Sequence, residues 1–479
     1  MTLDPQFLVF VLGIITVGAP LLLVLVLGGL RLLSRPISER FISRCVQSAV
    51  VTGLIASLCT LAIMLISGEK RVTVDMANWV ELGHDYHFAI KIEFDRLSVP
   101  FAILSFGLCG TIGAFANIYM HREGGFCRFF VLYAIFVLGM VVTSLAGTME
   151  TLFVGWEMVG LSSATLVAFY HDRPGPVSNG LKVWIVYRIG DAALLLASVV
   201  LHHVTKTGDF DQIFGITAWP NVHLKMVEMG RFNAGLIGSL LLIAAAGKSA
   251  MIPFSGWLPR AMEGPTPSSA VFYGALSVHL GAFLLLRVSP ILDYCLPVAA
   301  AVVLCGLVSA GFAAFAGSAQ TDIKSSLSFA SMTQVGIIFA EIGLASFIPT
   351  EYEWLRHLLR YIALIHILGH GCLRTLQFLR APSLLHDYRI LENAIGDHLP
   401  SMKARNQLSY SDRLRWRLYR FALERGYLDA VLTDFIVSPF LVTFRWCDRM
   451  ERKWTRFLGG PPKPHDSSQD AIVSLEDML

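Results

Sequence analysis

Residues 242–257 read LIAAAGKSAMIPFSGW and place a lysine, Lys248, inside an apolar run. A charged side chain at the centre of a membrane span costs about 2.5–3.5 kcal/mol on insertion scales, so such a residue is a functional candidate by default. Gly247 precedes the lysine, and Pro253 follows five residues later. Because a proline inside a span breaks or kinks the helix, we expect a broken helix around Lys248. Transporters build ion sites at mid-membrane from such interrupted helices.

The composition of the chain is that of an integral membrane protein. Of its 479 residues, 54% are hydrophobic and 15% are charged, and the mean hydropathy is +0.60. Soluble proteins carry about 25% charged residues. A net charge of +3 is too small to indicate nucleic-acid binding. Eight scattered cysteines without a C-x-x-C pair argue against a disulfide framework, an iron–sulfur site or a zinc ribbon. We therefore expect no metal and no cofactor in this chain.

The apolar runs predict an all-α polytopic protein. A spanning helix needs about 20 apolar residues, and by that rule we count about eleven spans. They lie at roughly 5–33, 45–67, 97–119, 128–147, 150–170, 181–203, 233–258, 267–288, 295–317, 326–345 and 355–380. Arginine and lysine gather in the loops after the odd-numbered spans, which the positive-inside rule makes cytoplasmic. We expect a protein of the cell inner (cytoplasmic) membrane with its N-terminus outside, its C-terminal tail inside and no cleaved signal.

Three parts follow from these spans. They are a two-helix segment with an extracytoplasmic loop, a membrane core, and a cytoplasmic or interfacial tail, at residues 1–95, 96–381 and 382–479. The loop at 71–95 partly alternates and is rich in β-branched and aromatic residues, which predicts a small hairpin. Residues 427–446 are apolar but contain two aspartates and a proline, so we favour an amphipathic helix in the membrane interface over a twelfth span.

Several ionisable side chains lie at the depth of the membrane. They are Glu157, Arg188, Asp191, Lys248, His279, Glu341, His366, His370 and Arg374. Neither Glu157 nor Lys248 has an opposite charge close to it on its own helix, so each requires a partner from elsewhere in the fold. Groups in such settings can exchange protons, and histidines titrate near neutral pH.

Each of these residues also has a simpler explanation. Arg188 and Asp191 are three apart, so they could form a structural ion pair on one helix face. Glu341 lies towards the end of its span, and we favour a structural role at the interface for it. A lone His279 among small residues is more often a packing residue than a relay member. His366 and His370 could chelate zinc, but the glutamate of H-E-x-x-H is missing, so we do not expect metalloprotease chemistry.

Five motifs together resemble a known family. In order they are VGWEMVGLSS (154–163), YRIGD (187–191), AGKSAMIPFSGWLPRAMEGPTPSSA (246–270), AQTDIKSSLSFASMTQVGIIF (319–339) and HILGHGCLRTLQFL (366–379). They are similar to the antiporter-like L subunit of respiratory complex I, whose module also occurs in Mrp-type antiporters, and the match covers about 95–380. The resemblance implies two inverted five-helix repeats, each with a broken helix, and a polar axis along which protons move.

The resemblance also assigns residues to a proton path. Those that match the family are Glu157, Arg188, Asp191, Lys248, His366 and His370, while Arg374 stands where the family usually has lysine, and His279 is a possible substitute for a family histidine. The broken helix is marked by Gly247 and Pro253 and by the GPTP prolines Pro265 and Pro267. One departure stands out: residues 383–426 are polar and charged, so the family's second broken helix, with its lysine, is expected to be absent.

A narrower resemblance concerns the DAB-type inorganic carbon accumulation complexes. The phrases LSVHLGAFLLLR (276–287) and GHGCLRTLQFLRAPSLLHD (369–387) are similar to their membrane subunit (the DabB branch). This implies a proton- or cation-conducting subunit that couples the ion gradient to a large soluble cytoplasmic partner similar to β-carbonic anhydrases (DabA type), which would hold zinc. Arginine at 374 fits conduction without pumping, because arginine stays charged.

Two alternatives remain open at the level of sequence. The first is a proton-pumping or Na+/H+ antiporter-like subunit of a complex I-like or Mrp-like assembly, with other antiporter-like membrane subunits as partners. The second is a passive membrane anchor whose buried charges have lost their role. None of the three interpretations gives this chain a catalytic site of its own.

Overall fold

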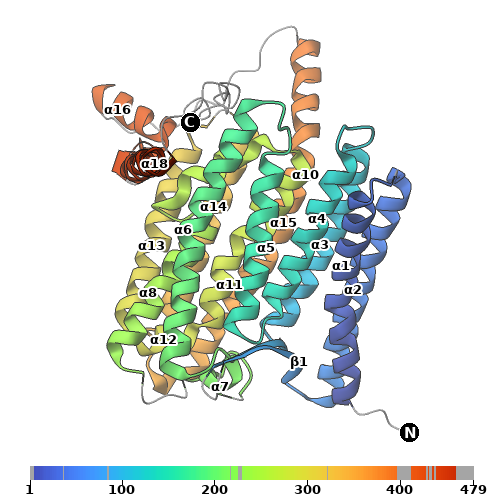
Figure 1. Cartoon of the computed structure of the whole chain (residues 1–479), viewed down its shortest axis with the longest axis vertical. Coiled ribbons are helices and arrows are strands. Elements are labelled where there is room, and N and C mark those ends of the chain that lie inside the picture. The colour runs from blue at the N-terminus through green and yellow to red at the C-terminus, as the bar shows by residue number, and fades with distance from the viewer. Residues whose placement is uncertain are drawn as a thin grey trace. The chain divides into compact units, whose positions relative to one another are not determined.

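The helices of the first part of the chain run side by side, with a two-stranded sheet at one end (Figure 1). The computed structural model describes residues 5–35, 37–82, 86–215, 217–224, 229–320, 322–395, 412–427, 430, 434–435 and 438–459. The chain divides into two compact units, Met1–Asn406 and Gln407–Leu479. Each unit is described by itself below.

The first unit contains most of the secondary structure. Its N-terminal elements are α1 (Pro5–Leu32), α2 (Glu39–Ser67), β1 (Arg71–Leu82), β2 (Tyr86–Asp95), α3 (Ser98–Tyr119), α4 (Phe126–Ser144), α5 (Met149–Val167), α6 (Pro174–Thr205), α7 (Phe210–Phe214) and α8 (Arg231–Lys248). Short turns η1 (Phe254–Gly256), α9 (Trp257–Arg260), η2 (Ala261–Glu263), α10 (Thr266–Ser269), η3 (Ala270–Ala275) and η4 (Ser277–His279) come next. They are followed by α11 (Leu280–Arg287), α12 (Ser289–Tyr294), α13 (Leu296–Gly317), α14 (Ile323–Ala345), η5 (Thr350–Tyr352) and α15 (Glu353–Ile395).

The membrane character predicted from the sequence is confirmed. In the described part of the chain, nine helices are long and apolar enough to cross a membrane. Two further predicted spans, 150–170 and 233–258, correspond to α5 and α8, which have 19 and 18 residues. Both carry charged residues, Glu157 and Lys248 among them, which lowers their hydropathy. The protein is a multi-pass membrane protein; the count of eleven spans and the inverted repeat remain predictions.

The span predicted at 233–258 is not one helix. Helix α8 ends at Lys248, and Ala250 adopts a positive φ of 56° before the chain continues in short turns. The polar groups freed by this break find partners on neighbouring elements: the Ile252 N–H donates to Ser309 Oγ at 2.9 Å, and Trp257 Nε1 donates to the Gly247 carbonyl at 3.1 Å. Hydrogen bonds of this kind, which replace those lost from the helix, allow irregular backbone inside a membrane protein.

A second interruption, which the sequence did not predict, follows the GPTP prolines. Pro265 precedes α10 as its N-cap and Pro267 lies in its first turn. The span Thr266–Arg287 then passes through a π-helical turn, η3, and a 3₁₀ turn, η4, before α11 begins. Ser249 Oγ donates to the Val278 carbonyl at 2.6 Å and so joins the two interruptions. Pro253 and the GPTP prolines thus flank two adjacent breaks.

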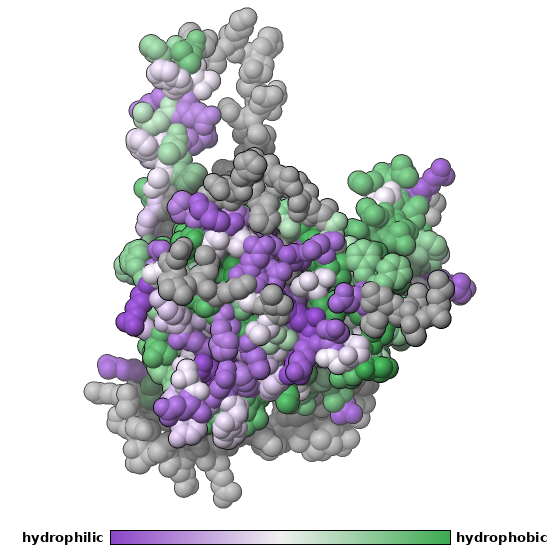
Figure 2. Space-filling view, turned by 90° about the horizontal axis from the view of Figure 1, so that it is seen from below, coloured by the Kyte–Doolittle hydropathy of each residue, from purple (hydrophilic) through white to green (hydrophobic). Residues whose placement is uncertain are grey.

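The predicted hairpin at 71–95 is present, so the chain is not wholly α-helical. Strands β1 and β2 pair antiparallel from Arg71↔Asp95 to Leu82↔Tyr86 with two register shifts. The hairpin contacts α1, α3 and α5 at the end of the bundle from which α1 starts (Figure 1). Figure 2 views the molecule from this side and shows hydrophilic residues gathered at the centre of the face. That the hairpin lies outside the membrane remains a prediction.

Close helix contacts hold the core together. Helices α13 and α14 approach so closely that a Cβ on Gly306 would lie 2.4 Å from the Gly336 carbonyl oxygen. Small residues at such contacts are the usual means by which membrane helices pack, because lipid offers no hydrophobic driving force.

The second unit contains α16 (Asp412–Leu423), η6 (Arg425–Tyr427) and α18 (Ser438–Gly459). The interfacial helix predicted at 427–446 is displaced along the chain, since α18 begins at Ser438 and ends at Gly459. Residues 428–429, 431–433 and 436–437 of that segment lie outside the described residues. Exposed apolar side chains recur along one face of α18, at Val442, Trp446, Met450, Trp454 and Phe457. This helix is not among the candidate spans of the described residues, and its place in the interface remains a prediction.

Candidate functional site

A cluster of four charged side chains lies between α5, α6 and the end of α8. Arg188 on α6 places Nη2 2.5 Å from Glu157 Oε2 and 2.6 Å from Asp191 Oδ2. The arginine therefore joins a carboxylate on its own helix to one on α5. Its guanidinium also lies 4.0 Å from the centre of the Trp184 ring, a cation–π distance.

Lys248 enters this cluster through Trp156. The Trp156 indole N–H donates to Asp191 Oδ1 at 2.7 Å, and the Trp156 carbonyl accepts from Lys248 Nζ at 2.9 Å. Lys248 is only 1% exposed, and its ammonium lies 5.0 Å and 4.6 Å from the ring centres of Trp156 and Tyr187. The buried lysine is thus held by a carbonyl, two aromatic faces and the field of the nearby carboxylates.

The break in α8 explains why the lysine can lie there. Lys248 is the last residue of the helix, so its ammonium sits at the end where the helix dipole favours positive charge. The preceding Gly247 packs against Gly190 of α6: a Cβ at Gly247 would lie 3.4 Å from the Gly190 Cα. This close approach of α8 to α6 brings Lys248 to the Arg188–Asp191 pair.

A second cluster contains two histidines and an arginine. His279, from the 3₁₀ turn before α11, places Nε2 2.8 Å from Nδ1 of His370 on α15. Arg374 Nε donates to His370 Nε2 at 3.1 Å, and its Nη1 donates to Gln377 Oε1 at 2.6 Å. Because arginine can only donate, His370 accepts at Nε2, so neutral His370 carries its proton on Nδ1 and donates it to His279.

His366, one turn before His370, belongs to a third group. Its Nδ1 lies 3.0 Å from Glu341 Oε1, and its Nε2 lies 3.0 Å from Gln334 Oε1. The His366 ring thus lies between a carboxylate of α14 and an amide of the same helix. The His366 and His370 ring centres are 6.4 Å apart, so the second and third groups are neighbours.

The predicted path residues thus fall into three groups. The structure brings Glu157, Arg188, Asp191 and Lys248 into one cluster, and His279, His370 and Arg374 into another, while His366 pairs with Glu341. No direct hydrogen bond from Lys248 to His279 is found in the described part. The Tyr187 hydroxyl, on the residue whose ring lies against Lys248, is close to the Ser277 hydroxyl of η4, the turn that also carries His279. Buried polar groups of this kind are ordinarily satisfied by water.

Sequence reasoning missed several contacts of the site. It favoured a structural role for Glu341 and did not foresee that its carboxylate contacts His366. It gave no role to Trp156, Gln334 and Gln377, which are polar neighbours of path residues. Trp156 directly precedes Glu157 in a quoted motif, which is the only signal that could have drawn attention to it.

A further buried ion cluster ties the hairpin to α11 and was also missed. Arg287, at the end of α11, donates to Glu93 at 3.0 Å and to Asp95 at 2.6 Å, and Arg71 pairs with Glu93 at 2.8 Å. Burial raises the pKa of Glu93 to about 7, and the adjacent Asp95 acts in the same direction against the arginines. Burial also works to raise the pKa of Asp95, but the Arg287 guanidinium prevails and lowers it to about 2.

The geometry supports no metal site within the described residues, where no three His, Cys, Asp or Glu side chains converge as ligands. The arrangement is instead a row of charged and hydrogen-bonding groups inside a helical bundle. Such a row can pass protons between titratable groups where water completes the connections.

Family models match most of the core. The model described as "NADH:quinone oxidoreductase/Mrp antiporter, TM" matches residues 146–414, more than half of the chain. A second, described as "NADH-Ubiquinone oxidoreductase (complex I), chain 5 N-terminus", matches 79–130.

Curated relatives agree with these models. NADH-quinone oxidoreductase subunit L of Rhodobacter capsulatus is 31% identical over 350 residues, which cover 70% of this chain and 47% of the relative. The subunit L of Escherichia coli (strain K12) is 30% identical over 321 residues, covering 67% of this chain and 49% of the relative. The chain therefore spans about half the length of the curated relatives it matches.

Solved structures share the fold. The Mrp complex from Dietzia sp. DQ12-45-1b matches with a TM-score of 0.59 and 22% identity, over 82% of this chain and 38% of that one. An archaeal membrane-bound sulfane sulfur reductase matches with a TM-score of 0.60 and 16% identity, over 77% of this chain and 70% of that one. Together with the family models, this shows that the chain belongs to the family of NADH:quinone oxidoreductase and Mrp antiporter membrane subunits.

Proposed function

We propose that the chain conducts protons across the membrane as an antiporter-like subunit of a multisubunit assembly of the complex I or Mrp type. The observation that carries the proposal is Lys248: a buried lysine at the end of a broken helix, joined through Trp156 to Asp191 and Arg188. A cation at that position without a transport role would carry the cost of burial for no gain.

Two halves of a path support this proposal. Lys248, with Glu157 and Asp191 nearby, forms the half in which an ammonium can give up and regain a proton. His279 and His370 form the other half, in which a proton moves along a hydrogen bond between two ring nitrogens. Water at the buried Tyr187 and Ser277 hydroxyls would complete the connection between the two halves.

The test replaces Lys248 in the full chain, co-expressed with its genomic neighbours and reconstituted in vesicles with a pH-sensitive dye inside. Lys248→Ala is expected to abolish proton flux. Lys248→Arg keeps the charge but exchanges protons poorly, so it should also conduct little. Lys70→Ala, an exposed lysine before the hairpin, is the matched control and should conduct normally. Normal flux in Lys248→Ala protein that folds and assembles would refute the path and leave the passive anchor as the explanation.

We further propose that the partner is a large soluble, carbonic-anhydrase-like protein and that the pair accumulates inorganic carbon. The support is the sequence resemblance of 276–287 and 369–387, together with Arg374 in a position where the family usually has lysine. Helix α15 also runs unbroken from Glu353 to Ile395. In the described residues after α15 no helix qualifies as a span, whereas the family resemblance implies a second broken helix there.

Growth distinguishes this narrower function from the pump or antiporter alternative. The chain, with and without its neighbouring gene, is expressed in cells that lack carbonic anhydrase. Rescue of growth in air by the pair, and by neither gene alone, supports carbon accumulation. Failure of the pair, combined with sodium- or quinone-dependent proton movement in vesicles, would favour a subunit of a redox-driven or antiporter assembly.

A further inference from the structure

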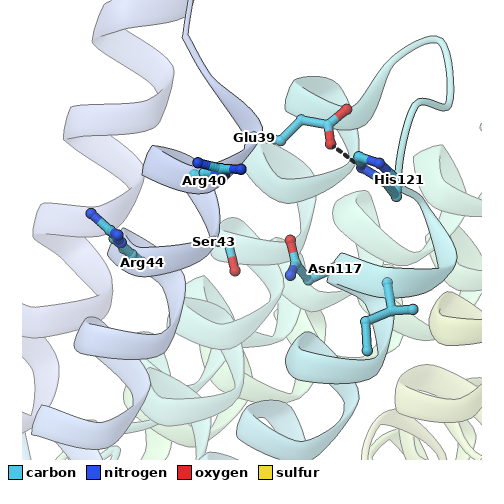
Figure 3. A pocket seen from close by; sticks show the side chains of 7 residues that line it. Glu39, Arg40, Ser43, Arg44, Asn117 and His121 are labelled. Carbon is cyan, nitrogen blue, oxygen red and sulfur yellow. Dashed lines mark hydrogen bonds and ion pairs between the residues drawn. The ribbon is translucent and has the colours of Figure 1, made fainter.

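A cavity of about 430 Å³ opens between the start of α2 and the end of α3. It lies away from the proton-path residues, and its lining residues are Glu39, Arg40, Ser43, Arg44, Asn117, Ile118 and His121. Figure 3 shows Arg40 and Ser43 of α2 turned towards the gap that Asn117 of α3 borders, with the Glu39–His121 pair above them.

The cavity is positively charged where a ligand would bind. Arg40 and Arg44 lie one helical turn apart, and neither forms an ion pair or hydrogen bond with any described residue. Glu39, the acidic residue of the lining, is bonded to His121 Nδ1 at 2.7 Å and to the Arg122 N–H at 3.1 Å and forms no ion pair with either arginine, so the lining keeps a net positive charge. Two arginines, a hydroxyl and an amide therefore line the cavity, and neither arginine is paired with a carboxylate of the described residues.

The location is that of a lipid headgroup. The lining helices are two candidate spans, Glu39–Ser67 and Ser98–Tyr119, and the cavity lies where the first begins and the second ends. At its edge, Ile118 is 79% exposed, as expected for a side chain that faces acyl chains. The cavity is therefore expected at the level of the lipid phosphates, next to the acyl chains.

An apolar groove continues from the same helix. A hollow of about 510 Å³ between α1 and α2 is lined by apolar residues of α1 and by Cys45, Ser48, Ala49 and Thr52 of α2. Arg44 borders the charged cavity, and Ser48, one turn further along α2, borders the groove. A molecule with a phosphate and a long hydrocarbon chain would fit both at once.

We propose that this site binds the phosphate of an anionic phospholipid, of the phosphatidylglycerol or cardiolipin class. Arg40 and Arg44 hold the phosphate oxygens, since guanidinium groups match phosphate in geometry as well as in charge. Ser43 and Asn117 donate to the phosphate or to the headgroup glycerol, and one acyl chain lies in the α1–α2 groove. A zwitterionic lipid is disfavoured because its own cation would approach two arginines. This site is independent of the proposed proton path.

The test measures lipids that remain bound to the purified full chain. Detergent-purified protein is incubated with equal amounts of phosphatidylglycerol and phosphatidylcholine, and the bound lipids are counted by native mass spectrometry. The wild type should retain phosphatidylglycerol preferentially. The double variant Arg40→Gln/Arg44→Gln should lose that preference by tenfold or more, on the order expected for two charge-assisted hydrogen bonds.

A matched control separates the site from diffuse surface charge. Arg31→Gln/Arg35→Gln removes the same charge at the same spacing from the last turn of α1 and the loop that follows it, but neither residue lines the cavity. It should retain the preference, and both double variants should melt at the wild-type temperature in phosphatidylcholine. Equal losses in both variants would overturn the proposal. Competition by inorganic phosphate as effective as that by phosphatidylglycerol would do the same, because the site would then take a free anion.

Discussion

At the scale of single residues, Trp156 joins two charged groups of opposite sign. Its indole N–H donates to the Asp191 carboxylate, and its carbonyl accepts from the Lys248 ammonium. The first contact depends on the side chain and the second on the backbone alone. A substitution can therefore remove the link to the carboxylate while the lysine keeps its carbonyl partner.

Trp156→Phe is expected to lower stability by about 1.5–3 kcal/mol, the typical value of a hydrogen bond to a charged group. Trp257→Phe is the matched control, since the Trp257 indole donates to a neutral carbonyl, that of Gly247, and should cost only about 0.5–1.5 kcal/mol. Thermal unfolding in detergent measures both. If Trp257→Phe cost as much or more, the charge on Asp191 would not determine the strength of the contact.

Arg374 tests how the histidine group handles protons. Its guanidinium donates to His370 from Nε and to Gln377 from Nη1, and it stays protonated at all accessible pH values. Arg374→Lys introduces an ammonium that can exchange its proton, so proton flux in vesicles should become steeper with external pH. Arg374→Gln, which removes the charge, is the control and should show no such added dependence. An unchanged profile in Arg374→Lys would place this residue outside the path.

The sequence located the charged members of the site because a charge at membrane depth is costly and therefore conspicuous. Glu157, Arg188, Asp191 and Lys248 lie together in the structure, while their role in a proton path stays a prediction. The contributions of Trp156 could not be predicted, since a backbone carbonyl has no sequence signature and a tryptophan in a span usually packs. The contact of Glu341 with His366 could not be predicted either, because distance from a span end says nothing about which histidine faces the carboxylate.

At the scale of elements, the break after Lys248 depends on side chains that replace the lost helical hydrogen bonds. The Ile252 N–H is one of the groups freed there, and Ser309 of α13 accepts from it. Ser309→Ala should therefore leave a partly buried N–H unpaired and cost about 1–3 kcal/mol.

Ser331 of α14 provides the comparison for that variant. Its hydroxyl is buried and has no partner among the described residues, so Ser331→Ala should be neutral or slightly stabilising. The melting temperatures of Ser309→Ala and Ser331→Ala, measured in the same detergent, distinguish the loss of this hydrogen bond from the loss of serine packing. A similar loss in both would mean that serine packing, and not the N–H of the break, sets the cost.

The hairpin is anchored by a buried ion cluster whose effect on stability depends on pH. Glu93 has a folded-state pKa of about 7 against an ordinary value of 4.5, so the folded protein holds its proton more tightly than the unfolded chain. Stability should therefore fall as pH rises from about 4.5 to about 7, by up to about 3 kcal/mol, and then level off. Asp95, whose pKa is lowered to about 2, acts in the opposite sense only below about pH 4.

Glu93→Gln removes the titrating group and should flatten the melting temperature between pH 5 and pH 7. Glu69→Gln, an exposed carboxylate just before the hairpin, should leave the wild-type slope intact. A wild-type melting temperature that rises across this window would show that the arginines keep Glu93 ionised in the folded state, contrary to the expected sign.

Elements differed in how well the sequence predicted them. The helices, the hairpin and the break at Lys248 follow from apolar length, alternation and proline position. The π-helical turn at Ala270–Ala275 does not, because it depends on how the chain after the GPTP prolines packs against neighbouring helices. Helix α18 is displaced from its predicted range because its amphipathic face continues to Gly459, where charged residues concealed it from a search for apolar runs.

At the scale of the whole molecule, the chain combines a membrane core with a smaller C-terminal unit, Gln407–Leu479. The chain spans about half the length of the curated relatives it matches. The C-terminal unit has a basic helix, α16, and an amphipathic one, α18, with exposed tryptophans. A surface of this kind suits either a membrane interface or a protein partner.

Truncation after Asn406 separates the two roles of the chain. Because Gln407–Leu479 is a compact unit of its own, its removal should leave the melting temperature of the core within about 2 °C and the chain in the membrane. If the soluble partner docks on the tail, as we propose, the truncated chain should no longer co-purify with it. Trp446→Ser/Trp454→Ser, which removes apolar anchors of α18, should retain the partner if those tryptophans face lipid and lose it if they face protein. Undiminished co-purification of the truncated chain would move the docking site to the core.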